Sequence, residues 1–115
     1  MKCLLLAHTD EASWLAMSDD EKGRIAATFG ANAEELKRAG VFVTAYRPQP
    51  SSTAKRVRIH NGTAEIQDGV LGDPNEPLTG VYIIDVPDMA TAVSWAERHP
   101  AARMGAIEVR PLSTY

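Results

Sequence analysis

The chain has 115 residues, of which 44% are hydrophobic and 23% are charged. Its length and composition predict one ordinary globular domain and argue against a disordered, collagenous or coiled-coil protein. Twelve basic and fifteen acidic residues leave a net charge of -3, which provides no basic field for nucleic acid. The apolar run near the N-terminus is too short for a signal peptide or a membrane span, and one cysteine cannot form an internal disulfide, so we expect a cytoplasmic protein without a membrane partner.

The first part of the chain predicts a strand, a helix and a second strand. Residues 2–8 form an apolar run that is too short for two helical turns, which favours a strand buried on both faces. A short helical turn follows, and then Ser18 with Glu21 three residues later is typical of a helix start. Gly40 ends this helix, and the β-branched and aromatic residues of 41–46 predict the second strand.

The middle of the chain predicts a β-hairpin. Two alternating runs within residues 56–67 flank the dipeptide Asn61-Gly62, which favours a two-residue type I′ turn. A two-residue turn sets Val57 opposite Ile66, so that one face of the hairpin is apolar and the other carries charged residues.

The last part predicts a loop over 68–79, a buried strand over 81–86, a helix over 89–98 and a strand over 106–110. The order is therefore β-α-β, a hairpin, and β-α-β again. This order predicts an α+β, ferredoxin-like split βαβ sandwich with an inserted β-hairpin, whose first and third strands are central.

Such a sheet has only enough helices to cover one face. Because its central strands are apolar on both faces, the other face would expose a larger apolar patch than soluble monomers normally tolerate. We therefore expect a homodimer in which two sheets pack face to face as a dimeric α+β barrel, and a pocket in any space between them.

Four side chains are candidate contacts for a small organic ligand. His8 shares strand parity with Leu4 and Leu6 and could face the dimer pocket as a base or ligand, or be a hydrogen-bonded histidine at a strand end. Arg47 could bind an anion through two hydrogen bonds, or be a solvated charge.

Asp68 could present its carboxylate to a ligand or accept hydrogen bonds from turn amides next to Gly69. Tyr82 could line the pocket or place its ring in the core. The three histidines and the cysteine lack ligand spacing, and the glycines form no phosphate-binding motif, so we predict neither a metal site nor a cofactor.

Several segments in a fixed order resemble the YCII-related family, and specifically its branch with an Asp-Gly-Pro-Phe motif. The segments are 1–6 with Asp10-Glu11, 34–41, 52–54 leading into Val57-Arg58, Gln67-Asp68-Gly69, 80–86 and 105–112. The resemblance covers nearly the whole chain and implies a ferredoxin-like dimeric α+β barrel, in a family whose biochemical role is mostly undefined.

The chain also departs from the pattern of this family. Asp68-Gly69 is followed by Val70-Leu71 rather than Pro-Phe, and the following stretch, 72–77, lacks a basic residue that the family pattern would place near the pocket mouth. Other members resemble enzymes with an acid–base pair of a histidine on the first helix and an aspartate before the last strand. Those places hold Phe29 and His99 here, so the pair is not carried over.

Two functions follow from these observations. The first is an enzyme-like protein that binds a small organic molecule, either between the sheet and the helices or at the dimer barrel, and transfers a proton, with His8 and Asp68 as polar contacts. The second is a non-catalytic dimer that binds a metabolite or a partner protein. A pocket with convergent polar groups and a perturbed titration would favour the first, and a filled interior would favour the second.

Overall fold

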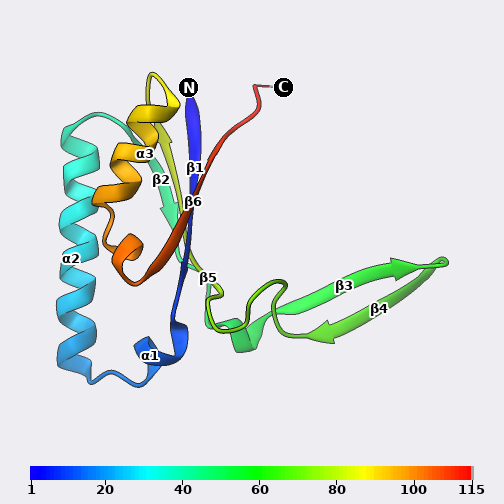
Figure 1. Ribbon diagram of the computed structural model, residues 1–115. Helices are drawn as coiled ribbons and strands as arrows, with labels where there is room; N and C mark the ends of the chain where they lie inside the picture. Colours follow the sequence, from blue (N-terminus) through cyan, green and yellow to red (C-terminus); the bar gives the residue numbers. More distant parts are fainter. Residues whose placement is uncertain (115) are drawn as a thin grey trace.

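The computed structural model describes residues 1–114 and consists of a body and a projecting arm (Figure 1). In chain order the elements are β1 (Lys2–Thr9), α1 (Glu11–Leu15), α2 (Asp19–Arg38), β2 (Phe42–Tyr46), η1 (Ser51–Thr53), β3 (Lys55–His60), β4 (Thr63–Asp68), β5 (Leu78–Asp85), α3 (Met89–Arg98), η2 (Pro100–Arg103) and β6 (Gly105–Pro111). Among residues 1–114 no helix is both long enough and apolar enough to cross a bilayer.

The body contains a four-stranded sheet in the order β2-β5-β1-β6, and all of its neighbouring strands are antiparallel. The central strands are β1 and β5, as their hydrophobicity predicts. The α+β class, the antiparallel sheet and the inserted hairpin are confirmed. The strand predicted over 81–86 begins earlier, at Leu78, because pairing with β1 continues to His8 after an irregularity next to Ala7.

The core lies between the sheet and the two long helices, which occupy the same side of the sheet (Figure 1). Alternate residues of β1 face this core, and the buried cluster consists of Cys3, Leu5, Leu36, Ile84, Val86, Ala92 and Ala96. On α3, Val93 is 41% exposed, and the larger ring of Trp95 packs against the core.

The other face of the sheet carries no helix. Leu4 pairs with Ile83 and Leu6 pairs with Val81, so these four side chains share this face, which we call the open face. The structure is that of one chain, and the dimeric barrel that would cover the open face stays a prediction.

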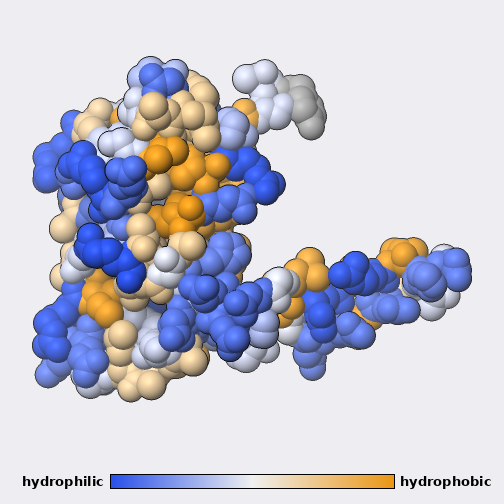
Figure 2. All heavy atoms as spheres, in the orientation of Figure 1, coloured by the Kyte–Doolittle hydropathy of each residue, from blue (hydrophilic) through white to orange (hydrophobic). Residues whose placement is uncertain are grey.

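The arm is the hairpin of β3 and β4. Val57 pairs with Ile66 and Ile59 pairs with Ala64, as predicted. The turn residues have positive φ angles, 50° at Asn61 and 77° at Gly62, which a type I′ turn requires. Figure 2 shows the arm standing clear of the body with hydrophobic atoms along it, and every residue of β4 is exposed.

Candidate functional site

A pocket of about 80 Å³ lies on the helix side of the sheet, where the last residue of β1 and the start of β5 meet α1. Most of its walls are apolar. The lining residues are Thr9, Glu11, Trp14, Leu15, Phe29, Arg47, Pro48, Pro50, Thr79, Tyr82, Ala101 and Met104. A buried water needs roughly 10–15 Å³, so the pocket has room for roughly six water-sized groups, which is one end of a small organic molecule.

The short helix α1 forms one wall of this pocket and exists because of a local cap. The Asp10 carboxylate accepts a hydrogen bond from the Ser13 backbone N–H at 3.1 Å and another from the Ser13 hydroxyl at 2.6 Å. These hydrogen bonds to the charged form lower the pKa of Asp10. The cap orients α1 so that Glu11 and Trp14 reach the pocket.

The connector from Arg47 to Ser51 crosses the pocket and is attached to α1 at two points. The Glu11 carboxylate accepts hydrogen bonds from the Ser51 backbone N–H, at 2.9 Å, and from the Ser51 hydroxyl. The Arg47 guanidinium carbon lies 4.5 Å from the centroid of a Trp14 ring, which is a cation–π contact. The two contacts hold a positive charge against the pocket on a backbone that Pro48 and Pro50 stiffen.

Arg47 has no carboxylate partner among residues 1–114, where the ion pairs of the other arginines are those of Arg98 with Glu35 and Arg110 with Glu108. The carboxylate in the pocket, that of Glu11, is occupied by Ser51. The positive charge at the pocket is therefore available to an anionic group of a ligand.

Tyr82 lies on the covered face of β5 and brings a hydroxyl to the pocket. Burial raises the pKa of Tyr82, and the charge of Arg47 opposes part of that rise. The phenol therefore stays protonated at neutral pH and can donate a hydrogen bond to a ligand oxygen.

His99 lies directly behind Tyr82. It is 2% exposed, and its ring centroid is 4.4 Å from that of Tyr82 and 5.7 Å from that of Phe29. Burial lowers the pKa of His99 to about 4, so the ring is neutral. Its Nδ1 accepts a hydrogen bond from the Ala101 N–H at 3.1 Å, which assigns the ring proton to Nε2.

Phe29 and His99, which stand at the two places where the resemblance would put an acid–base pair, are neighbours in space. One holds a phenyl ring and the other a buried neutral imidazole, a combination that cannot act as a histidine–carboxylate pair. Instead, His99 packs against the ring of Tyr82, and Phe29 packs against His99.

Of the four predicted site residues, the structure brings Arg47 and Tyr82 together in one pocket. His8 lies on the other side of the sheet, where its Nδ1 is 3.1 Å from the Glu76 carbonyl oxygen. Asp68 ends the arm, with an 80% exposed side chain that pairs with Lys55. His8 and Asp68 therefore do not contribute to the pocket that holds Arg47 and Tyr82.

His8 borders a second, wider hollow of about 420 Å³ at the base of the arm. Its lining residues are His8, Ala54, Lys55, Arg56, Val57, Arg58, Gly69, Val70, Leu71 and Leu78. This hollow lies on the side of the open face and combines apolar side chains with basic ones.

Two pocket residues, Glu11 and Trp14, were not expected from the sequence as site residues, and neither was His99, which packs against Tyr82. The contact of Trp14 with Arg47 depends on a connector 33 residues later in the chain, which no local pattern in the sequence indicates. Within residues 1–114 no group of three or more histidine, cysteine, aspartate or glutamate residues is placed to hold a metal ion.

Comparisons with known proteins agree with the resemblance in the sequence. The model of the YCII-related domain matches residues 1–115. A protein of Rhizobium meliloti (strain 1021), described as uncharacterised, is 29% identical over 113 residues, which cover 96% of this chain and 91% of that protein. Both matches span nearly the entire sequence, and the chain belongs to the YCII-related domain family.

Proposed function

We propose that the protein is a homodimer, with the architecture of a ferredoxin-like dimeric α+β barrel, that binds a small organic anion in the pocket of Trp14, Arg47 and Tyr82. One observation indicates that the ligand is an anion. Arg47 is held on the face of Trp14 beside an apolar cavity, without a carboxylate partner among residues 1–114. An apolar pocket with a few placed polar groups is the usual form of a small-molecule site.

The ligand has two parts in this proposal. Its anionic group, a carboxylate or an acidic phenol, lies against the Arg47 guanidinium and accepts a hydrogen bond from the Tyr82 hydroxyl. Its apolar part occupies the space next to Phe29 and Leu15. The pocket is small, so the rest of the molecule extends into solvent.

Binding is favoured over proton transfer by the state of the ionisable groups. Glu11 is engaged by Ser51, His99 is buried and neutral, and Tyr82 is a hydrogen-bond donor with a raised pKa. Proton transfer would need a general base, which is a side chain whose pKa lies near neutral pH and whose basic atom is free to accept a proton. None of these three side chains meets that requirement.

Thermal denaturation and ligand-observed NMR test the site with benzoate and isobutyrate as probes and benzamide as the neutral control. We expect the two carboxylates to raise the melting temperature and benzamide to leave it unchanged. Arg47→Gln should abolish the response, whereas the matched Arg58→Gln variant, on the arm, should keep it. Equal responses to benzoate and benzamide, or an unchanged response in Arg47→Gln, would exclude an anion site at Arg47.

The same NMR samples in D2O test proton transfer. A binding protein leaves the carbon-bound protons of a keto acid such as pyruvate at their uncatalysed rate of exchange. Exchange that is faster than the uncatalysed rate, and that returns to this rate in Tyr82→Phe, would show that the protein is an enzyme and not only a binding protein.

The homodimer in this proposal is supported by the open face, where the half-buried side chains of Leu4, Leu6, Val81 and Ile83 form an apolar surface that no helix covers. Sedimentation at micromolar concentration should show a dimer. Ile83→Lys, in the centre of the open face, should give a monomer, whereas Ala26→Lys, at an exposed position of α2, should leave the dimer intact. A monomeric wild-type protein would contradict the dimer and leave the ligand site to be tested separately.

A further inference from the structure

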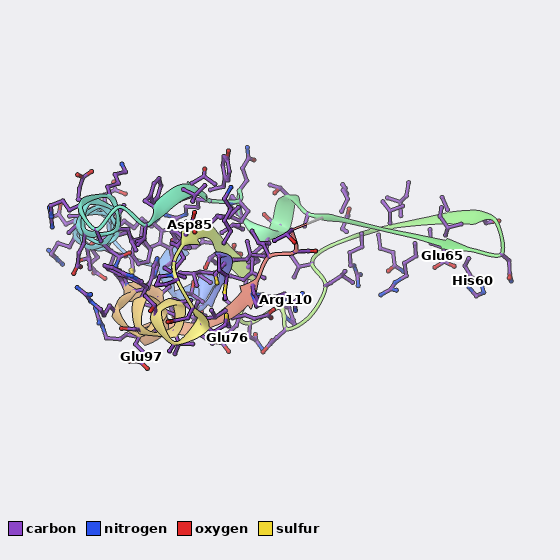
Figure 3. All side chains as sticks on the ribbon, turned by 90° about the horizontal axis from the view of Figure 1, so that it is seen from above. His60, Glu65, Glu76, Asp85, Glu97 and Arg110 are labelled. Atoms are coloured by element: carbon purple, nitrogen blue, oxygen red, sulfur yellow. The ribbon has the colours of Figure 1, made fainter. Side chains whose placement is uncertain are left out.

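The arm is the least compact part of the molecule. The radius of gyration is 16.0 Å, whereas a compact domain of this length has about 13 Å. Figures 1 and 3 show the reason: the hairpin leaves the body as a separate ribbon, with His60 and Glu65 toward its far end. An isolated two-stranded hairpin is only marginally stable in water, so a hairpin with this apolar content needs a contact that one chain does not supply.

One face of the arm is apolar and uncovered. Val57 is 63% exposed, Ile59 is 69% exposed and Ile66 is 68% exposed. These side chains share a face because Val57 pairs with Ile66 and Ile59 pairs with Ala64. We call this set of three residues the arm stripe. The opposite face carries Arg58 paired with Glu65, which is the usual composition of a solvated face.

The direction of the arm indicates what covers this stripe. Both α2 and α3 lie on one side of the sheet, and the arm projects on the other side, as the two perpendicular views show (Figures 1 and 3). That other side is the open face, with its own uncovered apolar residues. Anything seated on the open face therefore lies beside the arm.

The length of the arm matches a second copy of the chain. Six residues per strand extend about 20 Å from the body. Two sheets that pack face to face are about 10 Å apart, and a helical layer adds about 10 Å more. The arm therefore spans the sheet of a second copy and ends beside its helices.

We infer that the arm of each copy clasps the other copy, so that the arm stripe packs against the partner's body in the dimer. This inference deepens the proposed homodimer and rests on it. A twofold axis makes the contact reciprocal, so both arms are covered at once and no arm is left for a third copy. The hollow at the base of the arm, between His8 and Leu71, lies in the angle that the second copy would fill.

The test compares dimer dissociation constants by sedimentation equilibrium. Ile59→Lys places a charge in the arm stripe, and Thr63→Lys places the same charge on the opposite face of the arm. We expect Ile59→Lys to weaken the dimer roughly tenfold or more, and Thr63→Lys to leave it nearly unchanged. Both residues are exposed in one chain, so circular dichroism should show the body of each variant folded.

A second variant removes the arm without breaking the body. Gly69 N–H donates to the Ala54 carbonyl at 3.0 Å, so the two ends of the arm already meet. Replacement of residues 55–68 by Asn-Gly should close this gap with a tight turn. The armless protein should dimerise at least as weakly as Ile59→Lys. Hydrogen exchange of the wild-type arm should also slow as the protein concentration rises through the dissociation constant.

The outcomes separate the arm from the proposed sheet-to-sheet dimer. A wild-type dimer that Ile59→Lys and the armless protein both retain at full strength overturns the clasp and leaves the sheet interface standing. A dimer that Ile83→Lys retains, but Ile59→Lys loses, overturns the sheet interface and, with it, the clasp, because the clasp needs the second copy on the open face. A wild-type monomer overturns both, as would protection of the arm stripe only by a different protein.

Discussion

The strands of the body and of the arm both place apolar side chains on a face of a sheet, yet these side chains are buried in the body and exposed in the arm. In β1 every second residue is buried beneath the helices, and Cys3 and Leu5 are fully inaccessible. In β4 each residue is exposed, including Ile66. The pattern of apolar residues therefore predicts a strand and its faces, but not whether another element covers an apolar face.

The body and the arm are also stabilised by different interactions. The body is held together by burial of apolar surface between two layers. The arm has its turn, its ladder of backbone hydrogen bonds and exposed pairs such as Lys55 with Asp68, which contribute little in water. Variants in the two regions should consequently have effects of different sizes.

The largest expected effect is loss of a core side chain from the body. Leu5→Ala should lower the free energy of unfolding by about 2–5 kcal/mol, because a fully buried leucine leaves a cavity between β1 and the helices. Ile59→Ala, at protein concentrations below the dimer dissociation constant, should change it by less than about 0.5 kcal/mol. Urea denaturation measures both. Similar losses for the two variants would show that the arm is part of the core of a single chain.

The second effect concerns the pH dependence of the body. The pKa of His99 is lowered to about 4 in the folded chain, whereas an unfolded histidine has its ordinary value of 6.5. The unfolded state therefore binds more protons between these values, and stability is complete above pH 6.5 and falls as the pH decreases to 4. The loss from His99 should reach at most about 3 kcal/mol.

His99→Asn is the matched variant, because an asparagine oxygen can still accept the hydrogen bond from the Ala101 N–H. Denaturation between pH 7 and 4 should give a flatter profile for this variant than for the wild type. Parallel profiles would show that His99 is not neutral and buried.

A third, smaller effect is expected at the start of α2. The Ser18 hydroxyl accepts a hydrogen bond from the Glu21 backbone N–H at 3.2 Å. Ser18→Ala should cost about 1 kcal/mol in the free energy of unfolding, because it removes the N-cap. Ser94→Ala, at an exposed position inside α3, is the control and should be neutral or slightly stabilising. Urea denaturation that finds no difference between the two would exclude a role for the cap.

The smallest effect on global stability is expected in the turn of the arm. Gly62 has a φ angle of 77°, and a Cβ there is strained although it meets no atom. Gly62→Ala should destabilise the hairpin by about 1 kcal/mol and speed hydrogen exchange in the arm without changing the unfolding of the body. Gly30→Ala, in α2 with helical geometry and open space, should instead stabilise the body by about 0.5–1 kcal/mol.

Much of the fold follows from short-range patterns. The capping pair Ser18 and Glu21 placed the start of α2, and Asn61-Gly62 placed the turn and register of the arm. The start of β5 was misplaced by three residues, because its pairing with His8 is a long-range property. The pocket was only half predicted: Arg47 and Tyr82 were identified, but their meeting with Trp14 joins three separate segments of the chain.

The sequence by itself determined the order of strands and helices, the faces of each strand and the family, because these depend on neighbours within a few residues or on the whole pattern of the chain. Only the tertiary structure decided which polar groups meet, that His99 lies buried behind Tyr82, and that the arm leaves the end of the sheet toward the side of the open face. Those features depend on where distant segments pack, and packing is set by the complete set of side chains that compete to leave water.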